Sequence, residues 1–318
     1  MVENSLIIGS RGSELALYQT NLVKDTLEST YSHLSVEIKI IKTTGDKLLD
    51  VPLAKIGDKG LFTRQIESEL LSGEIDLAVH SLKDLQTVQP DGLVIGAVLE
   101  REIPNDVFVS GKYNSIDDLP QEASVATGSL RRHSQLLHYR PDLQIIEIRG
   151  NLPTRLQKLE SEGFDGMILA YAGMHRLGFD DQIRQVIPFK VMLPAVGQGA
   201  IAVETRSRDP RVNDLVRGLD HAESRACVTA ERSLLRVLEG GCQVPIGAFG
   251  RIVPDGLFLE GFVGSLDGSD CLQESTYGSS ADAEAIGKRL AESLLEKGAG
   301  DLLDQVRRDA EESQAEVV

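Results

Sequence analysis

Residues 6–23 read LIIGSRGSELALYQTNLV, and this stretch decides the fold. Its apolar start, Leu6 to Gly9, predicts a buried strand, and from Ser13 onward apolar side chains recur at helical spacing. A strand, a short polar turn and an amphipathic helix make up the repeating unit of α/β sheets. The stretch therefore predicts the first strand and helix of such a sheet, with Arg11 in the turn between them.

The same alternation continues along most of the chain. Strands are expected at 36–40, 75–79, 124–127, 144–148 and 167–171, with helices at 62–70, 129–139 and 151–162 between them. After Ala222 the pattern changes to a helix, then to strands with hairpin turns at 254–256 and 267–268, and finally to helices at 281–297 and 300–310. This change predicts a separate α+β domain at the C-terminal end.

The composition argues against a nucleic-acid-binding protein. The 318 residues carry a formal net charge of -16, aromatic residues make up 4%, and tryptophan is absent. Nucleic-acid binding needs a dense basic surface and gains from aromatic stacking, so we expect no nucleic-acid partner. The length of 318 residues predicts two or three domains.

Targeting and metal-binding signals are missing from the sequence. The first residues, MVENSLIIGSR, lack a basic segment followed by a long apolar one, and no apolar run is long enough to cross a membrane. We therefore expect a cytoplasmic protein with no membrane partner. Cys227, Cys242 and Cys271 form no CxxC pair and have no histidine at metal-ligand spacing, so neither a metal nor a disulfide framework is expected.

One stretch is basic against this acidic background. Residues 127–158 carry Arg131, Arg132, Arg140, Arg149, Arg155 and Lys158. Local positive charge in an acidic protein indicates a small polyanionic ligand. The alternative is that these side chains lie on solvated helix faces or in surface ion pairs.

Three polar turns each follow a predicted strand at its C-terminal end, which is where open α/β sheets bind ligands. The turns contain Arg11, residues 80–84 (HSLKD) and residues 127–132 (TGSLRR). At Ser129 the chain enters a helix, whose free N–H groups would face the same anion that Arg131 and Arg132 can bind. Residues 127–129 can also be read as an ordinary helix N-cap, and Lys83 with Asp84 as a solvent-facing turn.

Residues 197–202, GQGAIA, approximate the dinucleotide fingerprint GxGxxA. That fingerprint requires a strand before it and a helix after it. Here Pro194 precedes the motif and the β-favouring run Ala200 to Val203 follows it. The context therefore opposes a nicotinamide-cofactor site.

Cys242 follows two glycines, Gly240 and Gly241, that end a predicted helix running from Ala222 to Leu238. The C-terminal end of a helix carries partial negative charge, which raises a thiol pKa instead of lowering it. Such a thiol suits a stable covalent attachment better than a nucleophile that must turn over. The alternative is an inert cysteine in a glycine-rich turn.

The chain resembles the hydroxymethylbilane synthases, also called porphobilinogen deaminases, in ordered segments over most of its length. The matching segments are GSRGSELAL from Gly9, KIGDKGLFTRQIE from Lys55, DLAVHSLKD from Asp76, GSLRRHSQL from Gly128, IRGNLPTRLQKL from Ile148, ILAYAG from Ile168, LPAVGQGAIAVE from Leu193 and ERSLLRVLEGGCQVPIG from Glu231. The resemblance implies that four porphobilinogen molecules are deaminated and joined head to tail, and that water releases the product.

The resemblance also implies a cofactor. Growth would occur on a dipyrromethane primer held by a thioether to Cys242. By position in the family pattern, Ser129, Arg131 and Arg132 would mainly hold this primer, with Lys83, Thr127 and Arg155 adjoining. Asp84 would be the catalytic acid. The side chains implied for the incoming substrate and the growing chain are Arg11, Ser13, Gln19, Phe62, Arg149, Arg155, Arg176 and Gln198.

Some assignments have two readings. His80 is read as positioning its turn, although a histidine could also act as a general base. Phe62 could stack on a pyrrole ring or pack in the core. The chain departs from the family pattern at residues 85–87, LQT, where a proline is expected, and at Gly128, where serine is common.

The resemblance implies an α/β fold with two doubly wound lobes, similar to type II periplasmic binding proteins, and a smaller α+β C-terminal domain carrying the cysteine. The expected domains are 1–99 with 200–217, then 105–193, and then 222–318. A monomer is expected. A non-enzymatic two-lobed binding protein is the competing function. It would need neither a tethering cysteine nor the acid at position 84.

Overall fold

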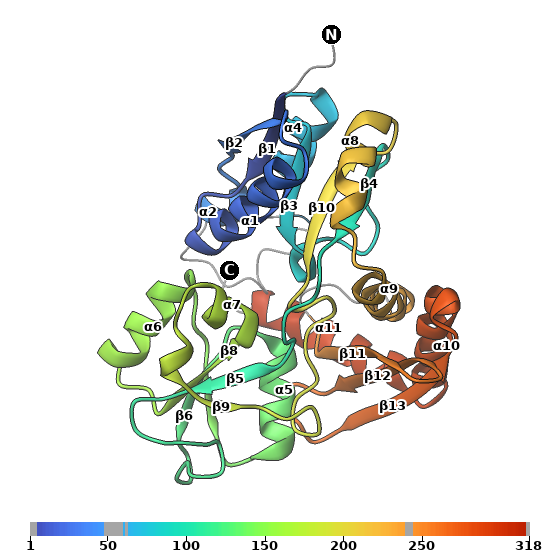
Figure 1. Ribbon diagram of the computed structural model, residues 1–318. Coiled ribbons are helices and arrows are strands. Elements are labelled where there is room, and N and C mark those ends of the chain that lie inside the picture. Colours follow the sequence, from blue (N-terminus) through green and yellow to red (C-terminus); the bar gives the residue numbers. More distant parts are fainter. Residues whose placement is uncertain (1–4, 48–59, 61–62, 239–243, 316–318) are drawn as a thin grey trace. The chain divides into compact units, whose positions relative to one another are not determined.

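The computed structural model describes residues 5–47, 60, 63–238 and 244–315. The described part of the chain divides into two compact units (Figure 1). Unit 1 comprises the described residues up to 102 together with 199–225, and unit 2 comprises 103–198 and the described residues from 226 onward. The chain therefore leaves unit 1 after Glu102, returns to it after Gln198, and leaves it again after Arg225.

Unit 1 is built on one five-stranded sheet in the order β2-β1-β3-β10-β4. The first three strands are parallel, and β10 runs antiparallel to both of its neighbours. The strands are β1 (Ser5–Ser10), β2 (Ser35–Ile40), β3 (Leu77–Ser81), β4 (Leu93–Val98) and β10 (Ile201–Arg206). The accompanying helices are α1 (Glu14–Thr30), α2 (Thr44–Lys47), α4 (Arg64–Ser72), α8 (Pro210–Val216) and two 3-10 turns, η1 (Leu82–Asp84) and η3 (Arg217–Leu219).

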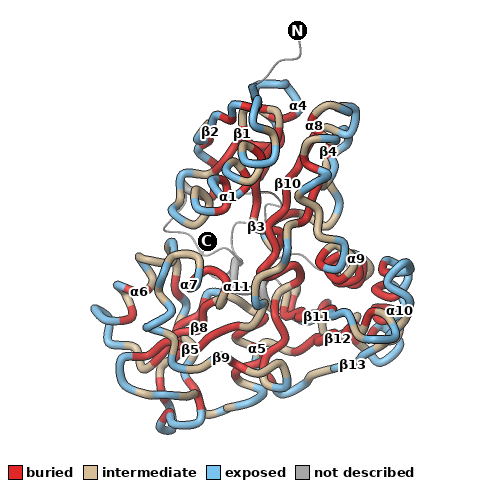
Figure 2. Tube along the Cα trace, in the orientation of Figure 1, coloured by how far each residue is buried: buried red, intermediate tan, exposed pale blue. Residues whose placement is uncertain are grey.

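Local chemistry explains the helix ends in unit 1. Ser13 caps α1, because its hydroxyl accepts a hydrogen bond from the Ala16 amide at 3.4 Å. Gly73 ends α4 in the left-handed conformation, with φ at 80°, as a glycine C-cap does. Figure 2 shows β3 and β10 buried along most of their length, so these strands form the centre of the unit.

Unit 2 contains a second five-stranded sheet, in the order β7-β6-β8-β5-β9. Its strands are β5 (Asp106–Val109), β6 (Ser124–Ala126), β7 (Gln144–Ile146), β8 (Gly166–Ala170) and β9 (Ile183–Val186). The helices of this part are α5 (Leu130–Tyr139), α6 (Leu152–Ser161), α7 (Tyr171–Arg176) and the 3-10 turn η2 (Asp180–Gln182). Here β6, β7 and β8 are parallel, and β5 is antiparallel to β8 and β9.

The two sheets share one topology. In each, three parallel strands are followed in the sheet order by an antiparallel strand, β10 or β5, that the chain enters directly after crossing from the other unit. This arrangement is that of type II periplasmic-binding-protein lobes, so the expected α/β fold class is confirmed.

The rest of unit 2 is a three-stranded antiparallel sheet, β11-β12-β13, with three helices. The elements are α9 (Ala222–Val237), β11 (Ile246–Val253), β12 (Gly256–Gly264), β13 (Cys271–Gly278), the 3-10 turn η4 (Ser280–Asp282), α10 (Ala283–Glu296) and α11 (Ala299–Ala315). Both predicted hairpin turns are confirmed, since Pro254 and Asp255 join β11 to β12, and Gly268, with φ at 72°, lies in the turn before β13. The boundaries of three separate domains stay a prediction.

Buried Glu231 ties two of these elements together. Its carboxylate accepts hydrogen bonds from the Gly197 and Gly250 amides, both at 2.8 Å. It lies on α9, whereas Gly250 lies on β11. Within the described ranges, no helix is both long enough and apolar enough to cross a bilayer.

Candidate active site

The carboxyl ends of β1, β2 and β3 meet at one edge of the unit 1 sheet, because the three strands are parallel. Arg11 follows β1 at this edge, and η1 follows β3. In η1, Leu82 is buried, Lys83 is half-buried and Asp84 is exposed. The edge therefore presents a cation and a carboxylate from two neighbouring strand ends.

The turn that carries Asp84 is fixed from both sides. Leu82 and Leu85 are buried, so apolar packing holds the backbone on each side of the aspartate. The Leu82 amide donates to the Ala200 carbonyl at 3.0 Å, and the Leu85 amide donates to the Leu82 carbonyl at 3.1 Å. The Asp84 carboxylate is thus exposed on a backbone that is held in place.

Gln19 and Ser13 have partners within unit 1. Gln19 is buried, and its amide group forms hydrogen bonds of 3.0 and 3.1 Å with the Ser81 hydroxyl. This pair joins α1 to the end of β3. Ser13 caps α1, as described above. The substrate-binding roles expected of Ser13 and Gln19 stay predictions.

The sheet of unit 2 gathers a second set at its corresponding edge. Thr127 and Ser129 follow β6, Arg149 follows β7, and Arg176 lies on α7, which follows β8. These strands are parallel, so their ends share one edge. Arg155, in the first turns of α6, donates from Nε to the Gly150 carbonyl at 2.8 Å.

Ser129 stands at the N-terminus of α5 in an extended conformation, and its side chain makes no cap hydrogen bond. Its amide donates instead to the Thr127 hydroxyl at 3.3 Å. Gly128 is required by close approach, since a Cβ there would lie 2.6 Å from the Ile148 carbonyl oxygen. The departure from serine at this position therefore fits the local packing.

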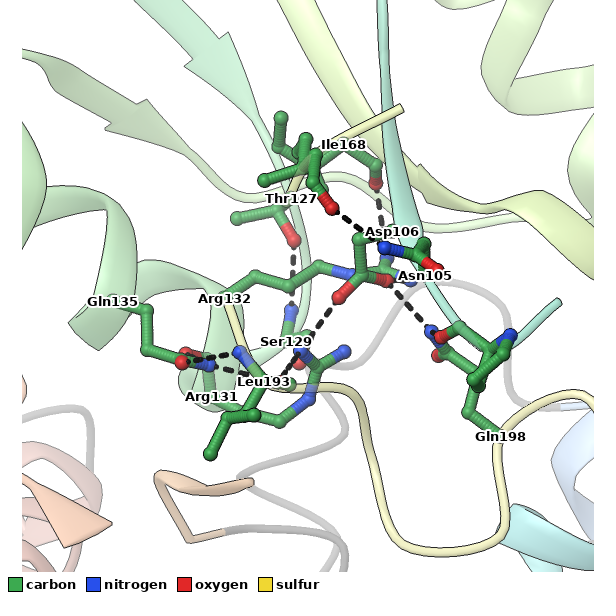
Figure 3. A network of polar contacts seen from close by, with 12 residues as sticks. Asn105, Asp106, Thr127, Ser129, Arg131, Arg132, Gln135, Ile168, Leu193 and Gln198 are labelled. Carbon is green, nitrogen blue, oxygen red and sulfur yellow. Dashed lines mark hydrogen bonds and ion pairs between the residues drawn. The ribbon is translucent and has the colours of Figure 1, made fainter. Parts of the chain in front are cut away.

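Arg131 and Arg132 are buried, and both pair with the buried carboxylate of Asp106 (Figure 3). Arg131 Nη1 lies 2.6 Å from Asp106 Oδ2, and Arg132 donates from Nε and Nη2 to Asp106 Oδ1 at 3.0 and 2.8 Å. Arg132 Nη1 also donates to the Ile168 carbonyl at 2.9 Å. The contacts through three nitrogens fix the plane of the Arg132 guanidinium.

The chain segment that returns toward unit 1 joins the same network. Arg131 Nη1 donates to the Leu193 carbonyl at 2.7 Å, and Gln135 binds the amide and carbonyl of the same residue at 2.7 and 3.0 Å. Gln198 donates from its amide nitrogen to Asp106 Oδ1 at 3.0 Å and to the Pro104 carbonyl at 2.6 Å. Gln198 therefore lies with the arginines expected to hold the primer.

The charges of this network leave it net positive, with two guanidiniums for one carboxylate. Burial alone would raise the pKa of Asp106, but the adjacent Arg131 and Arg132 outweigh it and hold that pKa well below the ordinary range of an aspartate. The buried Nε of Arg131 has no hydrogen-bond partner among the described residues. The net positive charge and the unpaired N–H of Arg131 thus favour an anionic ligand.

The arginines of residues 127–158 do not all have the same role: one forms an ion pair away from the candidate site, and others lie within it. Arg140 forms an ion pair with Asp142 at 2.7 Å, in which both side chains are half-buried, and it also donates to the Ile116 carbonyl at 2.9 Å. Arg131 and Arg132 are instead buried in a network that the sequence did not reveal, because their partner, Asp106, lies outside that stretch. The available signal was an aspartate at the start of an otherwise apolar strand, DVFV.

Two expected residues, Phe62 and Cys242, lie outside the described residues. The arrangement around GQGAIA agrees with the rejection of a dinucleotide site. The strand β10, and not a helix, follows the motif. Gly199 adopts φ at 87°, and a Cβ there would lie 2.4 Å from the Glu102 carbonyl oxygen.

Comparison with known proteins identifies the family. Residues 6–214 match the profile of the porphobilinogen deaminase dipyromethane cofactor binding domain, and residues 225–296 match the porphobilinogen deaminase C-terminal domain. The porphobilinogen deaminase of Pelotomaculum thermopropionicum is 53% identical over 97% of this chain and 99% of its own length. That of Carboxydothermus hydrogenoformans is 50% identical over 98% of this chain and 100% of its own length.

Among solved structures, the methionine binding protein MetQ has a TM-score of 0.43 at 12% identity, covering 68% of this chain and 89% of its own. A periplasmic substrate-binding protein of an ABC transporter from Coxiella burnetii has a TM-score of 0.44 at 15% identity, covering 67% of this chain and 91% of its own. These similarities are too distant to assign a ligand. The close relatives and the two family profiles together span almost the whole sequence, and this chain belongs to the porphobilinogen deaminase family.

Proposed function

We propose that this chain carries out the hydroxymethylbilane synthase reaction with Asp84 as its catalytic carboxylate and Cys242 as its cofactor tether. In this reaction, each porphobilinogen loses its amino group as ammonia, and its methylene carbon forms a carbon–carbon bond to the free α-carbon of the preceding pyrrole. That α-carbon loses its hydrogen as a proton. Water then releases the linear tetrapyrrole.

Asp84 suits two parts of this chemistry. Loss of ammonia leaves an electron-poor azafulvene, and bond formation leaves a positively charged pyrrole, so a nearby carboxylate stabilises the charge that develops. The same group can accept the departing proton. Asp84 is exposed on a turn held by buried Leu82 and Leu85, so its position is set before the substrate binds.

The residues around Arg131 fit a carboxylate-bearing cofactor. Their net positive charge, the unpartnered Nε of Arg131 and the α5 N-terminus beside Ser129 all favour an anion. Arg131, Arg132, Ser129 and Thr127 would hold the dipyrromethane, with Lys83 and Arg155 adjoining. When bound, the cofactor supplies the nucleophilic α-carbon of its terminal pyrrole.

Cys242 lies in sequence between α9 and β11, two elements that Glu231 joins through its bond to Gly250. The proposed thioether at Cys242 would therefore be attached between these two elements in the sequence.

The incoming substrate carries an acetate and a propionate, and arginine recognises such carboxylates through its planar fork. Arg11 at the edge of the unit 1 sheet, and Arg149, Arg155 and Arg176 at the edge of the unit 2 sheet, are our candidates for these groups. Ser13, Gln19, Phe62 and Gln198 complete the proposed substrate set. Gln198 would act by orienting the arginine network through Asp106.

The observation that carries the proposal is the buried network of two arginines and one aspartate, because it leaves positive charge and a free donor beside a helix N-terminus. The test is intact-mass spectrometry of the denatured protein, followed by peptide mapping around Cys242. We expect an added mass of two linked pyrrole units on that peptide. A thiol that stays unmodified after incubation with porphobilinogen would instead favour a non-enzymatic binding protein.

The catalytic assignment has its own test. Asp84→Asn should abolish ammonia release, because the amide neither balances the developing positive charge nor accepts the proton. Attachment of the primer at Cys242 should remain possible and is checked by mass. Full activity in Asp84→Asn would refute the role of this residue. We further propose that the protein works in the cytoplasm as a monomer, without a nucleic-acid partner.

A further inference from the structure

Unit 1 buries three ionisable side chains that the proposed chemistry does not use. They are Glu67 on α4, His80 on β3 and Glu204 on β10, and each is less than one-tenth exposed. His80 Nε2 lies 3.2 Å from Glu204 Oε2. Burial of charged groups is costly unless partners compensate it, so this cluster requires an explanation.

Strand pairing explains how the three side chains meet. In the antiparallel register, His80 is opposite Ala202, and Glu204 is opposite Ala78. His80 and Glu204 are therefore diagonal neighbours on one face of the sheet, within reach of long side chains. The helix α4 packs on both strands and adds Glu67 to the same place.

The cluster of Glu67, His80 and Glu204 has more hydrogen-bond acceptors than hydrogen-bond donors. Glu67 Oε1 and Glu204 Oε1 are both buried without a hydrogen-bond partner among the described residues. Burial raises the pKa of Glu67, and the negative charge of Glu204 adds to this effect against the opposing influence of Thr63, His80 and Arg64. Glu67 therefore keeps its carboxyl proton to a higher pH than an ordinary glutamate does, and a protonated carboxyl group supplies a hydrogen-bond donor to a cluster rich in acceptors.

The cluster lies directly before the turn that carries Asp84. His80 and Ser81 end β3, and η1 begins at Leu82. Leu82 donates to the carbonyl of Ala200, immediately before β10, and Glu204 on the same strand contacts His80. The two strands are thus joined on both sides of the point where the turn begins.

We propose that Glu67, His80 and Glu204 form a buried polar cluster that positions the turn bearing Asp84. This rests on the proposed function, because the position of Asp84 matters only if that carboxylate acts on the substrate. The residues of the cluster are positioning residues. His80 and Glu204 orient each other through their contact, and Glu67, whose pKa burial raises, supplies a proton donor to the same cluster.

The test uses the full-length, primer-loaded enzyme and three variants: Glu204→Gln, Glu67→Gln and the control Glu37→Gln. Glu37 is exposed on β2 of the same sheet. The measurements are kcat and KM for porphobilinogen from mildly acidic to alkaline pH. Primer loading is checked by intact mass.

We expect Glu204→Gln to lower kcat about tenfold to a hundredfold, as small displacements of a catalytic group do, with KM nearly unchanged. Glu67→Gln should keep its activity to higher pH than the wild type, because the amide keeps a donor where the acid would lose its proton. Glu37→Gln should match the wild type at every pH.

Equal kcat values and pH profiles for all three variants and the wild type would overturn the proposal. If Glu204→Gln does not fold, His80→Ala replaces it, since it removes the side chain that contacts Glu204, and the same fall in kcat is expected. A wild-type enzyme that carries no primer and consumes no porphobilinogen would instead refute the proposed function.

Discussion

At the residue scale, Asp106 decides whether the paired arginines can be buried at all. One carboxylate accepts three charge-assisted hydrogen bonds from Arg131 and Arg132, and a fourth hydrogen bond from Gln198. Removing one partner of a buried ion pair leaves the other charge uncompensated. The positions of Arg131 and Arg132 therefore depend strongly on Asp106.

Asp106→Asn should lower the free energy of unfolding by about 3 to 5 kcal/mol at neutral pH. The pKa of Asp106 is lowered in the folded protein, so its stabilising contribution is present above the ordinary pKa of an aspartate and is lost as the pH falls through the folded value. The difference between wild type and variant should therefore shrink in acid. Denaturant unfolding at several pH values measures it.

The matched control is Asp142→Asn, which breaks the half-buried pair with Arg140. Solvent screens such a pair, so the loss of stability should be much smaller than at Asp106. If the two variants lose equal amounts of unfolding free energy, burial does not make the Asp106 network more important for stability than the pair of Arg140 with Asp142.

At the element scale, the α6 N-terminus links local structure to the candidate site. The Asn151 side chain accepts hydrogen bonds from the Thr154 amide at 3.0 Å and from its hydroxyl at 2.7 Å. This cap fixes the first turn of the helix that carries Arg155. Loss of the cap should therefore affect both stability and substrate recognition.

Asn151→Ala should lower the free energy of unfolding by about 1 kcal/mol, the usual value of an N-cap side chain. It should also raise KM for porphobilinogen, because Arg155 loses its fixed position, whereas kcat should change less. Asn151→Ser keeps a capping oxygen and should behave almost as the wild type does. If KM is unchanged in Asn151→Ala, the N-cap of α6 does not contribute to substrate recognition.

The same scale shows what sequence patterns can predict. Helical spacing and stop signals place the helix expected at 129–139 within one residue of the observed Leu130–Tyr139. The strand expected at 75–79 is observed at Leu77–Ser81, because it ends on His80 and Ser81. His80 is buried and Ser81 is half-buried, and both contact partners on β10 and α1, which come from distant parts of the chain.

The residues of the candidate site also fall into those that local sequence patterns place and those that depend on distant segments. Turns at strand ends are local, so Arg11, Asp84 and Ser129 could be placed at sheet edges from the sequence. Partners that come from distant segments could not be placed. Asp106 and Glu204 each lie far in sequence from the residues they bind. The spacing of hydrophobic residues does not indicate which buried polar side chains will pair.

At the scale of the whole molecule, the two crossings of the chain determine how the turn that carries Asp84 is supported. The Glu102 amide donates to the Gly199 carbonyl at 3.3 Å, so the outgoing and returning segments lie side by side within unit 1. Directly after Gly199, the Ala200 carbonyl accepts from Leu82, and β10 then brings Glu204 to His80. The returning segment therefore supports the turn that carries Asp84.

Gly199→Ala tests this dependence. A Cβ at this position would lie 2.4 Å from the Glu102 carbonyl oxygen, at a backbone φ of 87° that favours glycine. We expect a loss of about 1 to 3 kcal/mol in the free energy of unfolding, from strain and displacement together. We also expect a lower kcat, because the displaced segment leads directly to the contacts that hold the Asp84 turn.

The control is Gly218→Ala, whose added Cβ would meet only the Tyr31 hydroxyl, at an ordinary contact distance of 3.8 Å. Both glycines lie in unit 1, so the comparison isolates the close approach of the crossing segments from a general effect of alanine. Denaturant unfolding and steady-state kinetics are measured on both variants. If the two variants lose stability and kcat equally, the crossing does not support the turn that carries Asp84. A fall in both quantities that is confined to Gly199→Ala means that the passage between the units also sets the position of the Asp84 carboxylate.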